Sequence, residues 1–324
     1  MTYPILQARI HQIRLEAQGI VSLELRPASA EATFPPFRAG AHIDLHLAPD
    51  LVRSYSLLHP AQKPNSYTVA VLKDPQSRGG SRAVHEQLRV GQTLTLSTPR
   101  NHFELVEDAP QTVLIAGGIG ITPLYAMLER LIELGRPAEL VYCARSRQQA
   151  AFLPELDALC AQSRGTASLS LRFDDEHGAP PDIKQMLAGR SKAAHYYACG
   201  PGQMLDAFES ACSALSLTNV HIERFSAKRD PVAAQAGSYI VTLKRSNKQL
   251  HVDRGVSLLD ALLDAGADVG YSCREGLCGS CEVRVVSGDV DHRDSLLNAS
   301  EQALNRTMMV CVSGCRSEAL VLDL

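Results

Sequence analysis

Three closely spaced cysteines in the last third of this chain constrain it more than any other feature. Cys273, Cys278 and Cys281 are separated by four and then two residues, and Cys311 follows after twenty-nine more. A C-x4-C-x2-C run with a distant fourth cysteine is the ligand spacing of a plant-type [2Fe-2S] cluster. Nine cysteines in a chain without an export signal favour metal ligation over disulfides. The pattern therefore predicts a small cluster-binding domain.

Two alternatives to this ligand set stay open. A four-cysteine zinc site would use the same donors, although paired zinc knuckles usually repeat C-x2-C. Cys315 is a second candidate for the fourth ligand, but Cys311 directly follows an apolar run that is typical of a strand. Gly276, Gly279 and Ser280 favour the cluster, because small residues let backbone N–H groups reach the sulfur atoms. We therefore expect an iron-sulfur cluster with Cys311 as its fourth ligand.

Composition and charge exclude several classes of protein. The 324 residues, 45% of them apolar and 21% charged, are enough for two or three globular domains. A net charge of −3 gives no basic excess for nucleic-acid binding. The first twenty residues lack the apolar stretch of a secretory signal, and the longest apolar-rich window, residues 113–128, is too short for a bilayer. We expect a cytoplasmic protein with no membrane or nucleic-acid partner.

The sequence pattern divides the chain into three regions joined by one linker. Residues 1–108 contain short alternating apolar and polar runs, which predict an antiparallel β-barrel with one helix at 81–88. Residues 109–225 alternate buried strands with amphipathic helices, which predicts a doubly wound α/β domain on a parallel sheet. Residues 226–237 have no periodicity and are expected to be a linker. Residues 238–324, with nine Lys and Arg against twelve Asp and Glu, predict an acidic α+β domain.

Turn signals place the elements of the last two regions. In the α/β region the expected strands and helices are residues 112–116, 123–134, 138–142, 148–161, 168–173, 182–187, 195–199, 202–215 and 220–225. In the third region we expect a strand at 239–243, a helix at 257–265 and a strand at 282–286 on either side of the cysteine-rich loop.

Three further motifs lie in the first two regions. The sequence R-S-Y-S at residues 53–56 falls on an expected barrel strand. G-G-I-G-I-T-P at 117–123 follows the first buried strand of the α/β region, and C-G-P at 199–201 ends its fourth. Taken singly, each also has a purely structural interpretation: a solvated strand face, a tight turn, and a small buried cysteine. Their order along the chain favours ligand binding.

The glycine-rich turn is suited to a dinucleotide. It has Pro123 where the Rossmann fingerprint requires its third glycine, so that fingerprint is not met. Thr122 is nevertheless a good N-cap and Pro123 a good first helical residue, which predicts a helix whose N-terminus faces a pyrophosphate. The expected contacts are Gly117, Gly118, Gly120, Thr122 and Pro123.

Together the four motifs resemble those of the phthalate dioxygenase reductase family over nearly the whole chain. The resemblance implies an FMN-binding barrel, an NAD-binding α/β domain and a plant-type ferredoxin domain of the β-grasp fold, in this order. It also implies an NADH-dependent oxidoreductase that passes hydride to FMN and then single electrons through a [2Fe-2S] cluster. The implied acceptor is a separate Rieske-type oxygenase or demethylase of aromatic hydrocarbon catabolism. The acidic third region is expected to dock on a basic patch of that partner.

The resemblance also implies the flavin contacts. Arg53 would pair with the flavin phosphate, Tyr55 would cover the ring system, and Ser56 would lie near flavin N5. The sequence R-G-G-S at 78–81 would open a helix toward the phosphate, which favours FMN over FAD. The residues implied at this site are Arg53, Ser54, Tyr55, Ser56, Val71, Lys73, Gly80, Ser81 and Arg82, and the turn Arg100-Asn101 approaches it less specifically.

The nicotinamide contacts follow in the same way. By resemblance, Cys199 approaches the nicotinamide, while Gly200 and Pro201 form a turn that lets the cofactor lie close. Phe225 would end the α/β region as an aromatic gate against the flavin, and a core residue at a domain boundary is the alternative interpretation.

Charged residues bear on the choice of nicotinamide cofactor. Asp174 and Asp175, at the close of the third α/β strand, are placed to accept hydrogen bonds from a ribose and to repel a 2′-phosphate. We therefore expect NADH, with Asp174 as the contact. Arg145 and Arg147, after the second strand, keep NADPH as an alternative.

Other functions are compatible with the same cofactors. The partner could be a monooxygenase of another type, or the chain could be a non-catalytic redox sensor that uses its cluster as a switch. The complete flavin and nicotinamide motifs argue against the sensor.

Overall fold

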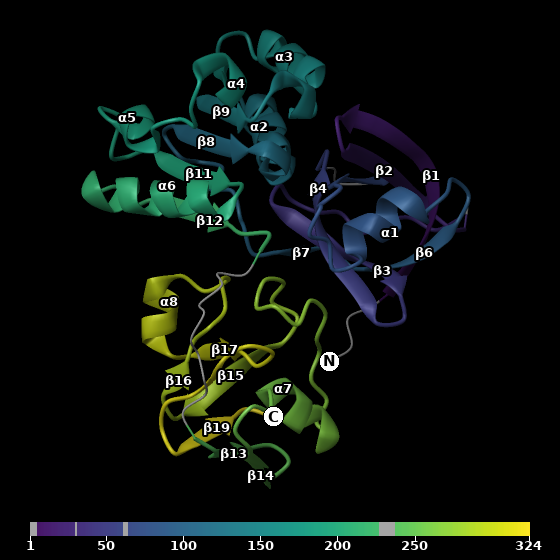
Figure 1. Ribbon diagram of the computed structural model, residues 1–324, viewed down its shortest axis with the longest axis vertical. Coiled ribbons are helices and arrows are strands. Elements are labelled where there is room, and N and C mark those ends of the chain that lie inside the picture. The colour runs from purple at the N-terminus through teal and green to yellow at the C-terminus, as the bar shows by residue number, and fades with distance from the viewer. Residues whose placement is uncertain (1–4, 30, 61–63, 227–236) are drawn as a thin grey trace. The chain divides into compact units, whose positions relative to one another are not determined.

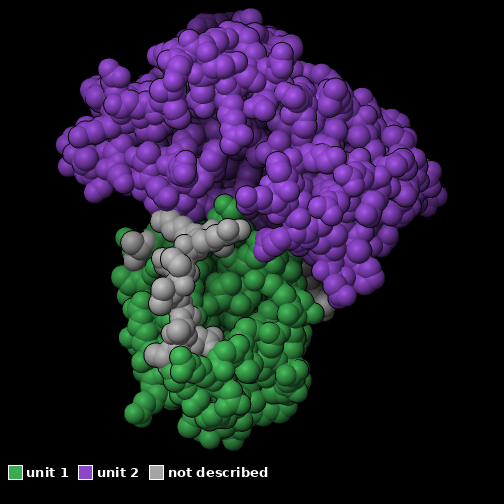
Figure 2. All heavy atoms as spheres, viewed as in Figure 1, with its two compact units in different colours: residues 1–4, 226–324 green, residues 5–225 purple. Residues whose placement is uncertain are grey.

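The computed structural model describes residues 5–29, 31–60, 64–226 and 237–324 (Figure 1). Two compact units, Ile5–Phe225 and Ser226–Leu324, divide these residues (Figure 2). The expected linker at 226–237 lies, apart from its two end residues, outside the described residues. Within the described part of the chain, no helix is both long and apolar enough to cross a bilayer.

The first part of the larger unit is an antiparallel sheet that closes on itself. Its strand order is β4-β5-β2-β1-β6-β3-β7, and an additional pairing of β3 with β4 closes it. Ile10, Ile43 and Tyr67 are among the side chains that fill its core. The elements are β1 (Ile5–Ala17), β2 (Ile20–Pro27), β3 (Ala41–Ala48), β4 (Leu51–Leu58), β5 (Tyr67–Leu72), α1 (Gly80–Glu86), β6 (Thr93–Ser97) and β7 (Arg100–Asn101).

The second part of this unit is a parallel sheet covered by helices on both faces (Figure 1). The strand order is β10-β9-β8-β11-β12. Leu114 and Tyr197 pack in the core with α2 and α3, whereas Val113 and Tyr196 pack with α5 and α6, so the predicted doubly wound arrangement is confirmed. The elements are β8 (Thr112–Gly117), η1 (Gly118–Gly120), α2 (Ile121–Glu133), β9 (Ala138–Ala144), η2 (Arg147–Gln149), α3 (Leu153–Gln162), β10 (Ala167–Phe173), α4 (Asp174–His177), α5 (Ile183–Leu187), β11 (His195–Cys199), α6 (Gly202–Ala214) and β12 (Val220–Glu223).

The smaller unit is a mixed sheet with one helix packed on it, as expected of a ferredoxin domain. The strand order is β14-β13-β19-β15-β17, and β16 pairs separately with β18. Leu258 and Leu262 of α7 share a core with Val241 and Leu320 of the sheet. The elements are β13 (Tyr239–Leu243), β14 (Lys248–Val252), α7 (Leu258–Asp264), β15 (Glu282–Ser287), β16 (Val290–Asp291), α8 (Ala299–Leu304), β17 (Thr307–Met309), β18 (Gly314–Cys315) and β19 (Ala319–Leu322).

The predicted N-cap at Thr122 is wrong. A single 3-10 turn, Gly118–Gly120, leads directly into α2, so the helix already begins at Ile121. Thr122 therefore lies inside the first turn, where its Oγ1 donates to Ile119 O at 3.1 Å instead of accepting a backbone N–H. The glycine turn is consequently shorter than the sequence predicts.

Three other boundaries differ from prediction. The single helix expected at 148–161 is divided into η2 and α3, because Phe152 adopts a left-handed φ of 65° between them. Asp174 and Asp175 begin α4 rather than closing β10. The helix expected at 81–88 spans Gly80–Glu86.

Candidate functional site

Arg53 on β4 lies against the beginning of α1. Its Nη2 donates to Arg78 O at 3.1 Å and its Nη1 to Val52 O at 2.8 Å. Gly80 makes this approach possible, since a Cβ at that position would lie 2.6 Å from Arg53 Cγ. The guanidinium and the backbone of residues 78–80 thus form one cradle. A fixed guanidinium beside closely approaching backbone fits a phosphate group.

A buried carboxylate that the sequence did not reveal lies behind this strand. Asp44 on β3 is 3% exposed. Ser54 Oγ donates to its Oδ1 at 2.6 Å, and Arg100 Nη2 donates to its Oδ2 at 2.7 Å. Ser54 therefore positions the strand. Its neighbour Tyr55 is largely shielded from water, and burial raises its pKa to about 12, so its hydroxyl stays neutral.

The other expected flavin residues lie around α1 and already have roles of their own. Val71 is buried in the barrel core. Lys73 Nζ pairs with Glu86 Oε1 at 3.0 Å on the surface. Ser81 Oγ accepts a backbone N–H from the preceding loop, and Arg82 is exposed. As flavin contacts, these four residues stay predictions.

The glycine-rich turn and the C-G-P turn touch through their backbones. They end the adjacent parallel strands β8 and β11, in which Ala116 lies opposite Cys199. A Cβ at Gly120 would be 2.2 Å from Cys199 O, and one at Gly200 would be 2.9 Å from Gly117 Cα. Only glycine permits this approach. The two turns also contain Gly118, Thr122, Pro123 and Pro201.

Ser56, Cys199 and Glu223 form one cluster from β4, β11 and β12, in which Ser56 and Cys199 are buried and Glu223 is partly buried. Ser56 Oγ donates to Glu223 Oε2 at 3.4 Å, and Glu223 lies beside Cys199 on the neighbouring strand. Burial raises the pKa of Glu223 to about 8, so the carboxyl is neutral at pH 7. Burial, and then the charge of Glu223, raise the pKa of the Cys199 thiol. Sequence reasoning missed Glu223, although it stands two residues before Phe225.

Replacing Glu223 with glutamine is expected to change how stability depends on pH. The ordinary pKa of the carboxyl is 4.5, so between pH 4.5 and about 8 the native state holds a proton that the unfolded state has lost. Stability of the unaltered protein should therefore fall as pH rises through this window, by up to about 1.4 kcal/mol for each pH unit relative to the Glu223→Gln variant. Urea unfolding of both proteins from pH 5 to 9 measures this difference. The same pH dependence of the free energy of unfolding in both proteins would contradict the raised pKa of Glu223.

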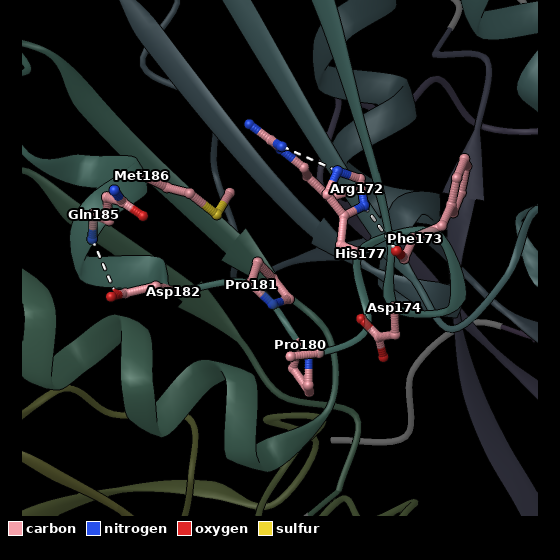
Figure 3. A pocket seen from close by; sticks show the side chains of 10 residues that line it. Arg172, Phe173, Asp174, His177, Pro180, Pro181, Asp182, Gln185 and Met186 are labelled. Atoms are coloured by element: carbon pink, nitrogen blue, oxygen red, sulfur yellow. Dashed lines mark hydrogen bonds between the residues drawn. The ribbon is translucent and has the colours of Figure 1, made fainter.

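Phe225 and Asp174 lie outside β4, β11 and β12, the strands that carry this cluster. Phe225 follows β12 and is 42% exposed, so its ring is available for a ligand. Asp174 lines a pocket of about 230 Å³ beside the end of β10 (Figure 3).

The four expected cluster ligands form two pairs. The sulfur of Cys273 lies beside that of Cys278, and the sulfur of Cys281 lies beside that of Cys311. A four-cysteine zinc site needs four sulfur atoms around one ion, whereas a [2Fe-2S] cluster takes two on each iron. The donor set therefore fits the two-iron cluster.

The loop between the ligands turns its backbone toward the sulfur atoms. The backbone N–H of Glu275 donates to Cys273 Sγ at 3.3 Å. Gly276 has a φ of +68°, and a Cβ there would lie 2.6 Å from Val312 Cγ2 and 2.9 Å from Asp294 Cα. The expectation that a small residue is needed here therefore has a steric basis.

Cys315 lies apart from this group. It belongs to β18, and its Sγ donates to Ser317 O at 2.9 Å. Cys311 instead lies beside the Cys281 sulfur and the Gly276 backbone. The geometry thus favours Cys311 as the fourth ligand.

Two protein families match segments of the chain. The 2Fe-2S iron-sulfur cluster binding domain matches residues 241–316, and the oxidoreductase NAD-binding domain matches residues 114–210.

Similar proteins match nearly the whole chain. Phenoxybenzoate dioxygenase subunit beta of Ectopseudomonas oleovorans is 45% identical over 98% of this chain and 96% of its own length. The solved structure of phthalate dioxygenase reductase, a modular structure for electron transfer from pyridine nucleotides to [2Fe-2S], is 34% identical with a TM-score of 0.68, over 99% of this chain and 98% of its own. An intact type IV self-sufficient cytochrome P450 monooxygenase is 36% identical with a TM-score of 0.89, over 99% of this chain and 41% of its own.

Proposed function

Because this chain belongs to the phthalate dioxygenase reductase family, we propose that it supplies electrons from NADH to a separate Rieske-type aromatic oxygenase or demethylase. It is an oxidoreductase with an NAD-binding domain and a [2Fe-2S] domain. The observation that carries the proposal is the Ser56–Glu223–Cys199 cluster, in which the strand expected to hold flavin meets the strand end expected to hold nicotinamide.

The chain's own residues would bind and orient the reactants. Arg53 and the cradle at residues 78–80 hold the flavin phosphate, and Tyr55 covers the ring. Gly200 and Pro201 form the turn that lets the nicotinamide lie close to the backbone beside Cys199, and Ser56 directs its hydroxyl into the same cluster. When bound at these residues, FMN would supply the change from a two-electron donor to single electrons, and the [2Fe-2S] cluster would supply one-electron transfer.

The proposed domains follow the sequence pattern. We place the FMN-binding barrel at residues 1–108 and the NAD-binding domain at 109–225. The linker would span 226–237 and the ferredoxin domain 238–324. Since NADH is supplied inside the cell, we place the protein in the cytoplasm.

A second candidate acceptor is a cytochrome P450. One of the similar structures is a self-sufficient cytochrome P450 monooxygenase, of which this chain matches 41%. The relative that is a dioxygenase subunit matches over 96% of its own length, which favours a separate oxygenase as the partner.

A visible spectrum of the anaerobic protein, before and after one equivalent of NADH, tests the proposal. Flavin bands over a broad iron-sulfur absorption, all bleached by NADH, are the expected result. A flavin spectrum without iron-sulfur absorption would contradict the electron path. Turnover of NADH with ferricyanide distinguishes a reductase from a redox sensor, which would not turn over.

A further inference from the structure

The residues around the pocket of Asp174 bear on the choice between NADH and NADPH. The pocket lies between the end of β10, α4 and the beginning of α5, and Phe173 and His177 also line it (Figure 3). The carboxyl ends of β9 and β10 are adjacent, with Ala144 opposite Phe173. The segment after β10 lines the pocket, and the segment after β9 contacts it through Phe173 and Glu176.

Arg147, which follows β9, is held by two contacts beside this pocket. Its Nε donates to Glu176 Oε1 at 2.7 Å. Its Cζ lies 4.8 Å from the centroid of the Phe173 ring, a stacking geometry that favours a guanidinium. Arg147, one of the two arginines that the sequence leaves open as 2′-phosphate contacts, is thus already paired with a carboxylate of α4.

Arg172, the arginine that lines the pocket, is engaged as well. Arg172 Nη1 lies 3.2 Å from His177 Nε2. A 2′-phosphate carries a charge of about −1.5 to −2 at neutral pH and needs free basic side chains. Asp174 adds a negative charge in the pocket itself. Glu176 matters most, because it alone forms an ion pair with the stacked arginine among the contacts of the described residues.

We propose that Glu176 is a specificity-determining residue that pairs with Arg147 and thereby favours NADH over NADPH. This inference rests on the proposed use of a nicotinamide dinucleotide at the ends of β8 to β10. Removing the carboxylate charge would leave the stacked guanidinium free to donate to a 2′-phosphate, while the ribose contacts of NADH would not change.

The test compares kcat/KM for NADPH and NADH, with ferricyanide as acceptor and the full cofactor-loaded chain. Glu176→Gln should raise the NADPH to NADH ratio by about tenfold, the effect of one charge-assisted hydrogen bond. Adding Arg147→Gln should return the ratio to that of the unaltered protein. Glu133→Gln removes an exposed carboxylate that pairs with Arg130 at 3.2 Å on α2, and it should leave the ratio unchanged.

Three results would overturn the inference: no change in the ratio for Glu176→Gln, a gain that survives in the double variant, or the same gain in Glu133→Gln. Oxidation of NADH by the unaltered protein is measured in the same assay. Its absence would count against the proposed function, whereas an unchanged ratio with normal NADH oxidation counts only against the role of Glu176.

Discussion

Replacing Cys311 with alanine is expected to remove the iron-sulfur absorption and to reduce electron transfer to cytochrome c on the order of 100-fold or more. The reason is the paired arrangement of the sulfur atoms, in which Cys311 is the partner of Cys281. Without it, one iron would keep a single thiolate. Reduction of the flavin by NADH should persist, because it depends on the other compact unit.

Cys315→Ala is the matched control for this variant. Both cysteines lie in the same unit, but the Cys315 sulfur bonds to Ser317 rather than to another cysteine. The control should retain iron, sulfide and cytochrome c reduction. Full iron content in Cys311→Ala, or its loss in Cys315→Ala, would contradict the assignment. Iron and inorganic sulfide per chain, measured beside the visible spectrum, distinguish these results.

Local signals were sufficient to predict much of the fold. The period-two run at 239–243 has the bounds of β13, and Ser257 begins α7 by accepting the N–H of Asp260, as its side chain favours. The cysteine spacing required a loop with small residues, and Gly276 adopts the positive φ that only glycine takes without strain. These features depend on residues within a few positions of each other, which sequence reasoning can evaluate.

Contacts between distant segments could not be predicted in this way. Ser56 and Glu223 are 167 positions apart and meet only because the barrel and the parallel sheet form one unit. Asp44 stands in an alternating apolar and polar run, where a charged residue is expected to face the solvent. It is nevertheless buried, and it accepts hydrogen bonds from Ser54 and Arg100. The N-cap at Thr122 was mispredicted because propensity cannot show that a 3-10 turn extends the helix upstream.

Replacing Gly120 with alanine is expected to lower kcat/KM for NADH by about 100-fold, the effect of moving a binding group by roughly 1 Å. Its φ of −62° is ordinary, so backbone strain is not the cause. The added Cβ would lie 2.2 Å from Cys199 O and 2.6 Å from Gly200 N, both backbone atoms that cannot rotate away. The two turns must therefore separate, and the nicotinamide site between them is expected to lose its geometry.

Gly202→Ala is the control, because that glycine begins α6 and a Cβ there would meet nothing within 4 Å. It should leave NADH oxidation with ferricyanide within about twofold of the unaltered protein, as for other surface substitutions. Thermal unfolding followed by circular dichroism separates a local displacement from global unfolding, and the iron-sulfur absorption reports on the other unit. If Gly120→Ala kept full kcat/KM with an unchanged melting temperature, the close approach of the two turns would have no part in binding the dinucleotide.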